Sequence, residues 1–213
     1  MKHLFLTSKF HHVASNIATK LSNSQKQHLV FIVTPFKYRV FKEVELDWHY
    51  ANLKAMEENG ITFDLYDISG KSEADLARDL AKYESLYVEG GSPFFFMQES
   101  LKNNFGEYIK KRLEDGMVYI SESAGSVVAG ADISANSRPG KSYKDYQLDG
   151  TKGFGFVNFV ILPHWGQESK ESDYLNYKIP QSYNEDFPII LLSNNQYVEV
   201  VGDQFKIIDI TKE

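Results

Sequence analysis

Residues 117–130 have the sequence MVYISESAGSVVAG, in which a strand-like run changes abruptly into a run of small residues. Residues 117–122 predict a strand, and residues 124–130 predict a closely packed helix. Because a tight strand-to-helix turn leaves no room for bulky side chains, the Ser-Ala-Gly step would expose the Ser123 hydroxyl at a sharp corner. This arrangement is typical of a nucleophile elbow, G-x-S-x-G, with Ser121 in place of the first glycine. In the alternative interpretation, Ser123 only caps the helix.

Composition narrows the class of protein. The chain has 213 residues, 42% of them hydrophobic, which suits one globular α/β domain. Its formal net charge of −6 argues against a nucleic-acid partner, which requires a basic surface. The chain has no cysteine, which excludes a cysteine nucleophile and fits a reducing compartment. Residues 1–6 are too short an apolar run for a secretory signal, and no run is long enough to cross a membrane, so we expect a soluble, cytoplasmic protein.

Strand-like and amphipathic segments alternate along the chain. The expected strands are residues 4–6, 28–34, 61–68, 86–88, 117–122 and 157–162, and the expected helices are residues 41–58, 72–83 and 94–113, the last broken near Asn103. This alternation predicts an α/β fold with a mostly parallel sheet flanked by helices on both faces. Residues 132–155 predict a long polar loop, and residues 189–210 predict a hairpin. No linker interrupts residues 1–213, so we expect a single domain.

Three candidate groups follow predicted strands, at the edge of an open α/β sheet where reactive groups collect. Gly90 and Gly91 follow residues 86–88, Ser123 follows residues 117–122, and His164 follows residues 157–162. A serine nucleophile needs a base such as imidazole, and glycine lets backbone N–H groups approach a developing oxyanion. Alternatively, the glycines only form a turn and His164 is an inert polar residue.

These residues and their order resemble a known family. The sequence of Gly90-Gly91-Ser92-Pro93, then Glu122-Ser123-Ala124-Gly125, then Leu162-Pro163-His164 is similar to that of the S51 serine peptidases, whose type member is peptidase E, an α-aspartyl dipeptidase. The resemblance covers nearly the whole chain. It implies a class I glutamine amidotransferase-like fold, which is a flavodoxin- or Rossmann-like three-layer arrangement. It also implies that Ser123 is the nucleophile, that His164 is the general base, and that the N–H groups of Gly90, Gly91 and Ala124 form the oxyanion hole.

The third member of the implied triad departs from the family pattern, because Asn194 stands where the family has a glutamate. An asparagine oxygen can accept a hydrogen bond from histidine, but it cannot supply the negative charge that stabilises an imidazolium. Neutralising the acid of a serine protease costs roughly 10⁴-fold in turnover. We therefore expect a Ser-His-Asn site that is slow or specialised. The rival orienting groups are Glu122, Asp145 and Asp149, although Glu122 should point to the opposite side of its strand from Ser123.

The resemblance implies a small peptide substrate, with Asp-X dipeptides as the default. The segment after His164 that should hold the carboxylate-binding arginine contains only lysines, so Lys170, Lys178 or Arg138 would have to bind the acidic side chain. We expect residues 132–155 to close the cleft against longer peptides. The alternative function is a catalytically weak homologue that binds a small acidic peptide, a metabolite or a partner protein in the same cleft. No cofactor or metal is implied, and the sequence is compatible with a monomer or a homo-oligomer.

Overall fold

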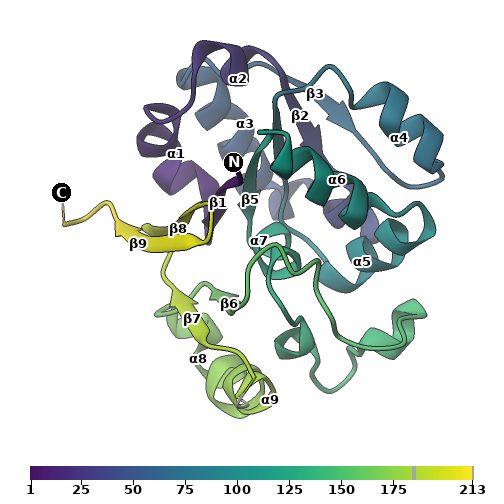
Figure 1. Ribbon diagram of the computed structural model, residues 1–213. Coiled ribbons are helices and arrows are strands. Elements are labelled where there is room, and N and C mark those ends of the chain that lie inside the picture. Colours follow the sequence, from purple (N-terminus) through teal and green to yellow (C-terminus); the bar gives the residue numbers. More distant parts are fainter. Residues whose placement is uncertain (184–185, 213) are drawn as a thin grey trace.

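The main sheet has seven strands in the order β3-β2-β4-β5-β1-β8-β9 (Figure 1). The computed structural model describes residues 1–183 and 186–212. Five strands run parallel, and these are β1 (His3–Thr7), β2 (Leu29–Ile32), β3 (Phe63–Tyr66), β4 (Ser85–Val88) and β5 (Val118–Glu122). An antiparallel hairpin of β8 (Gln196–Val201) and β9 (Gln204–Asp209) extends the sheet beyond β1. The predicted mostly parallel sheet is therefore confirmed.

Helices cover both faces of this sheet and make three layers (Figure 1). One face packs against α4 (Glu73–Asp79), α5 (Pro93–Lys102), α6 (Phe105–Glu114) and α7 (Ala124–Ala129). The other packs against α1 (Phe10–Ala18) and α3 (Asp47–Glu58), with the short α2 (Asn23–Gln27) preceding β2. Because successive strand residues point to opposite faces, Leu4 and Leu6 enter the first core and Phe5 enters the second. Burial on both faces explains why these strands are continuous apolar runs.

Several predicted elements differ from the structure. Residues 189–210 are not one hairpin, because β7 (Ile189–Leu192) leaves the main sheet and pairs in parallel with β6 (Val160–Pro163). Residues 41–58 are helical only from Asp47, and a 3₁₀ turn at Glu43–Glu45 precedes that helix. The predicted break near Asn103 is present, and Asn104 adopts φ 53° between α5 and α6. The sequence did not predict α1 or α2.

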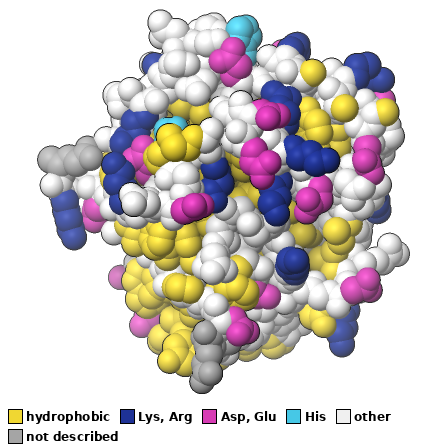
Figure 2. All heavy atoms as spheres, in the orientation of Figure 1, with side chains coloured by type: hydrophobic (Ala, Val, Ile, Leu, Met, Phe, Trp, Pro, Cys, Tyr) yellow, Lys and Arg dark blue, Asp and Glu magenta, His cyan; other side chains and the backbone are white. Residues whose placement is uncertain are grey.

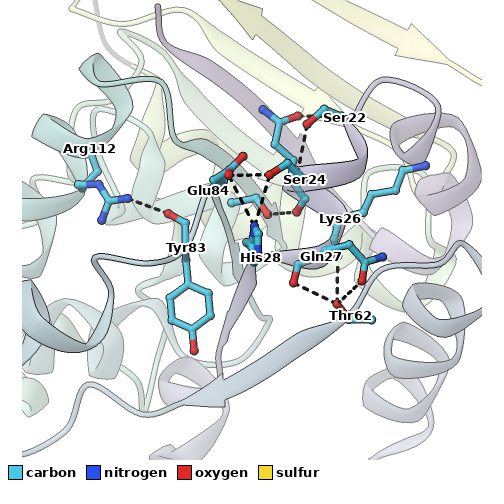
Figure 3. Close-up of polar contacts among 11 residues, drawn as sticks. Ser22, Ser24, Lys26, Gln27, His28, Thr62, Tyr83, Glu84 and Arg112 are labelled. Carbon is cyan, nitrogen blue, oxygen red and sulfur yellow. Dashed lines mark hydrogen bonds and ion pairs between the residues drawn. The ribbon is translucent and has the colours of Figure 1, made fainter.

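Polar contacts surround the amino ends of β2 and β4 (Figure 3), whereas Ser123 follows the carboxyl end of β5. Ser24 Oγ donates to Glu84 Oε1 at 2.6 Å, and His28 Nδ1 lies 3.6 Å from the same carboxylate oxygen. Arg112 on α6 donates to the carbonyl oxygen of Tyr83 at 2.7 Å. These contacts join α2 and α6 to the starts of β2 and β4, so the polar residues here have a structural role.

Acidic and basic side chains are interspersed over the face of the molecule in Figure 2. No helix in the described part of the chain has the length and apolar character needed to cross a membrane. A hollow of about 530 Å³ lies between α5, α6 and residues 148–155 of the long loop. A smaller cavity opens at Ser123.

Candidate active site

Ser123 occupies a strained corner between β5 and α7, with φ 47° and ψ −104°. Positive φ is uncommon for residues other than glycine and is often found at functional sites. The Ser123 N–H donates to the carbonyl oxygen of Thr7 at 3.0 Å, which holds the corner against the end of β1. A Cβ on Gly125 would lie 2.5 Å from the carbonyl oxygen of Val88, so only glycine lets α7 pack this closely on β4. The Ser-Ala-Gly step therefore has the steric cause that the sequence predicted.

His164 follows β6 and also has a positive φ, 72°. Its Nε2 lies 2.9 Å from Ser123 Oγ, within hydrogen-bond distance. Burial is the main reason that the pKa of His164 is lowered to about 4; a hydrogen bond with Asn194 raises it, and nearby lysines lower it. The imidazole is consequently neutral at pH 7 and can accept a proton.

Asn194 lies between β7 and β8, and its Oδ1 is 3.2 Å from His164 Nδ1. Parallel pairing of β6 with β7 accounts for this approach, because Pro163 is opposite Leu192 and both segments then leave the sheet together. Two of the rival acids lie away from His164: Asp145 accepts from the Ser142 N–H at 2.8 Å, and Asp149 is exposed beside the larger hollow.

A residue that the sequence analysis did not select completes this cluster. Ser8 follows β1 and is fully buried, and its hydroxyl lies 2.9 Å from Asn194 Oδ1 and 3.3 Å from His164 Nδ1. The β1–β5 register places Thr7 opposite Glu122, so Ser8 and Ser123 are the next residues of neighbouring strands. Ser8 follows the first strand and so also obeys the rule that reactive groups collect at strand ends.

The Gly90-Gly91 turn lies beside Ser123. A Cβ on Gly91, whose φ is 142°, would lie 2.1 Å from the carbonyl oxygen of Pro35, so the close approach requires glycine. A Cβ on Gly90 would be 3.6 Å from Ser123 Cβ. The N–H groups of Gly90, Gly91 and Ala124 have no hydrogen-bond acceptor among the described residues. These donors are free to bind a substrate oxygen.

The cavity at Ser123 has a volume of about 330 Å³, and both aromatic and charged side chains line it. Tyr38, Phe41 and Trp48 form an aromatic wall, whereas Lys9 and Lys170 bring positive charge. The lining includes residues from segments 38–48 and 164–170 but none from residues 132–155, and residues 148–155 of the long loop line the other hollow. The expectation that residues 132–155 close this cleft is therefore not supported.

Comparison with known proteins agrees with this geometry. The family model described as peptidase family S51 matches residues 4–208.

This chain belongs to peptidase family S51.

Relatives of this S51 peptidase match it over almost their whole length. An uncharacterized peptidase of Listeria monocytogenes, Lmo0363, is 29% identical over 204 residues, 96% of this chain and 97% of that relative. An uncharacterized peptidase of Pasteurella multocida, PM1590, is 29% identical over 215 residues, covering 98% and 97%. The crystal structure of a candidate peptidase E protein from Listeria monocytogenes EGD-e superposes with a TM-score of 0.78, at 28% identity and 98% coverage of both chains. The predicted class I glutamine amidotransferase-like fold is thus confirmed.

The three cations predicted for substrate binding lie at different places in the S51 peptidase. Lys170 lines the cavity, but Arg138 pairs with Asp173 at 3.1 Å. Lys178 lies over the Tyr174 ring, 4.8 Å from its centroid, and burial lowers the pKa of Lys178 to about 8, helped by the charges of Lys170 and Arg138. Lys9, which the sequence analysis did not select, reaches the cavity directly.

Two buried acids flank the Gly90-Gly91 turn of the S51 peptidase. Glu122 contributes to the lining of the cavity at Ser123, and its carboxylate is directed toward α1, which covers the face of the sheet opposite to α7. Its Oε2 accepts from the Phe10 N–H at 2.7 Å, and burial raises the pKa of Glu122 to about 8. Burial also raises the pKa of Glu89, whose Oε1 is 2.5 Å from His49 Nδ1. The described residues contain no group of three or more His, Asp or Glu that could hold a metal ion.

Proposed function

We propose that this S51 peptidase is a serine-type dipeptidase that cleaves short peptides through Ser123, His164 and Asn194. The single observation that carries the proposal is the 2.9 Å approach of His164 Nε2 to Ser123 Oγ at a strained corner, beside unpaired N–H donors. Such a pair is the working core of acyl transfer by serine hydrolases.

The proposed reaction has two steps, acylation of Ser123 and hydrolysis of the acyl-serine, and His164 transfers the proton in both. Ser123 Oγ attacks the carbonyl carbon of the scissile peptide bond, and His164 Nε2 takes the hydroxyl proton. The carbonyl oxygen becomes an oxyanion, which the N–H groups of the Gly90-Gly91 turn and Ala124 stabilise. When the C–N bond breaks, the imidazolium gives its proton to the departing amine. Water then attacks the acyl-serine with His164 as base, releasing the acid and restoring the hydroxyl.

The substrate preference rests on the charge of the cavity. Lys9 and Lys170 would favour an acidic residue in the substrate, so Asp-X dipeptides are the first candidates. Lysine binds a carboxylate as a point charge and not through the paired bonds that arginine makes, so we propose a weaker preference than an arginine would give. A cytoplasmic location and the state of assembly stay predictions of the sequence.

A dipeptide panel tests the proposal. Release of free amino acid is measured for Asp-X, Glu-X, Asn-X and Leu-X dipeptides with the wild-type protein and with Ser123→Ala. We expect hydrolysis of at least the acidic dipeptides, and its loss in the variant. Hydrolysis that persists in Ser123→Ala would assign the activity to another group.

The second candidate is a binding protein with little catalysis, which the neutral Asn194 favours. In that case the panel gives no hydrolysis, while calorimetry detects an acidic dipeptide bound to the wild type and not to Lys170→Glu. Measurable turnover of a dipeptide therefore distinguishes the peptidase from the binding protein.

A further inference from the structure

The Ser8 hydroxyl is buried among a small number of polar groups, so each of its hydrogen bonds can be assigned. It has three polar neighbours, which are the His164 N–H at 2.8 Å, Asn194 Oδ1 at 2.9 Å and His164 Nδ1 at 3.3 Å. A serine hydroxyl has one proton to donate and two lone pairs to accept with. Because Ser8 is fully buried, its partners must come from these groups.

The count assigns each bond a direction. The His164 backbone N–H can only donate, so it takes one lone pair of Ser8 Oγ. Asn194 Oδ1 can only accept, so it takes the Ser8 proton. Ser8 then has one lone pair left, and His164 Nδ1 must be the donor to it. The proton of the neutral imidazole therefore lies on Nδ1, and Nε2 presents a bare lone pair to Ser123 Oγ.

An asparagine at position 194 does not by itself fix which nitrogen of His164 carries the proton, whereas a carboxylate would. A carboxylate only accepts, so it always selects the Nδ1–H form of a neighbouring histidine. An asparagine can turn its NH₂ toward Nδ1 and favour the opposite form, in which Nε2 carries the proton and cannot act as base. In the structure Asn194 Oδ1 faces Nδ1, and in this orientation Oδ1 accepts the Ser8 proton at 2.9 Å while Nδ1–H lies within reach of both Asn194 Oδ1 and Ser8 Oγ. The bond from Ser8 to the His164 N–H also satisfies a backbone group at a residue with φ 72°.

We propose that Ser8 is a positioning residue which, together with Asn194, replaces the acid of the triad. It acts through His164 and does not touch substrate. The inference rests on the proposed function, in which His164 is the base.

A double-mutant cycle tests it. Ser8→Ala should lower kcat by about 10- to 100-fold with little change in KM, the size expected for lost hydrogen bonds to a group that becomes charged. Ser8→Thr, which keeps a hydroxyl, should recover part of this loss. In the Asn194→Asp background, the same Ser8→Ala change should cost several-fold less, because the carboxylate selects the Nδ1–H form unaided. An equal loss in both backgrounds would mean that Ser8 only supports the structure.

Nitrogen NMR of the wild type provides a test that does not depend on the folding of any variant. Long-range proton–nitrogen correlations at pH 7 should show His164 with a protonated Nδ1 and an unprotonated Nε2. A protonated Nε2 overturns the inference. The Ser123→Ala variant separates the two levels: if it still hydrolyses dipeptides the proposed function fails, whereas an inactive Ser123→Ala with a fully active Ser8→Ala rejects only the role of Ser8.

Discussion

Asn194→Asp replaces one acceptor of the His164 ring with an acceptor of the same shape that carries a negative charge. The carboxylate would stand 3.2 Å from Nδ1, with Ser8 already donating to the same oxygen position at 2.9 Å. We expect the substitution to make His164 a stronger base and to stabilise the imidazolium that forms in the transition state. Aspartate is the better choice than glutamate because it does not lengthen the side chain.

The size of the effect follows from the distance. Opposite unit charges 3.2 Å apart interact by roughly 5 kcal/mol at an effective dielectric constant of about 20. Placing a carboxylate in this partly buried position offsets about half of this. The pKa of His164, about 4 in the wild type, should then rise to roughly 6. The same energy corresponds to a gain of roughly 100-fold in kcat/KM at pH 8, well below the 10⁴-fold that separates acid and amide in other serine proteases.

The assay is the pH profile of kcat/KM for the best dipeptide, with Asn194→Ala as the control that removes the acceptor. A neutral base is required, so wild-type activity should fall only as the pH approaches 4, and the variant's activity should fall near 6. The advantage of the variant should therefore shrink about tenfold between pH 8 and pH 5. A variant that is no faster than the wild type, or whose acid limb does not move, would refute the assignment of Asn194.

Three further substitutions test other parts of the account. The pKa of Glu122 is raised from 4.5 to about 8, so between these pH values the folded protein keeps a proton that the unfolded chain releases. The free energy of unfolding should therefore fall as the pH rises, by up to roughly 1.4 kcal/mol per pH unit. Denaturant unfolding at pH 5 and pH 8 should show a smaller fall in Glu122→Gln than in the wild type. Gly91→Ala forces a Cβ against the Pro35 carbonyl and should lower kcat by about 100-fold or more, whereas the control Gly150→Ala, with no atom within 4 Å of the new Cβ, should keep full activity. Lys170→Glu should raise KM for Asp-X by about tenfold at low salt and leave Leu-X unchanged, and an equal change for both substrates would exclude a contact with the acidic side chain.

The sequence predicted best what local sterics and sheet topology determine. The corner at Ser123 follows from small residues between a strand and a helix, and the Gly90-Gly91 turn and His164 follow from the convergence of strand ends. Ser8 obeys the same rule, but a serine after a first strand is too common to be selected without its neighbours. The apolar run of β7 predicts a strand and not its partner, so the second sheet was not foreseen.

The walls of the cavity were harder to predict because they depend on tertiary contacts. Residues 41–46 look helical in sequence, yet the Arg39–Glu45 ion pair and the packing of Phe41 against Phe36 accompany an irregular segment there. That segment brings Phe41 to the cavity, and the 3₁₀ turn that precedes it, Thr34–Tyr38, brings Tyr38.

Covalent labelling with a fluorophosphonate, located by mass spectrometry, tests the activated serine itself. We predict a single adduct on the peptide that contains Ser123, absent in Ser123→Ala and formed far more slowly in His164→Ala. An adduct on another residue, or labelling of Ser123 that is as fast without the imidazole, would contradict this prediction.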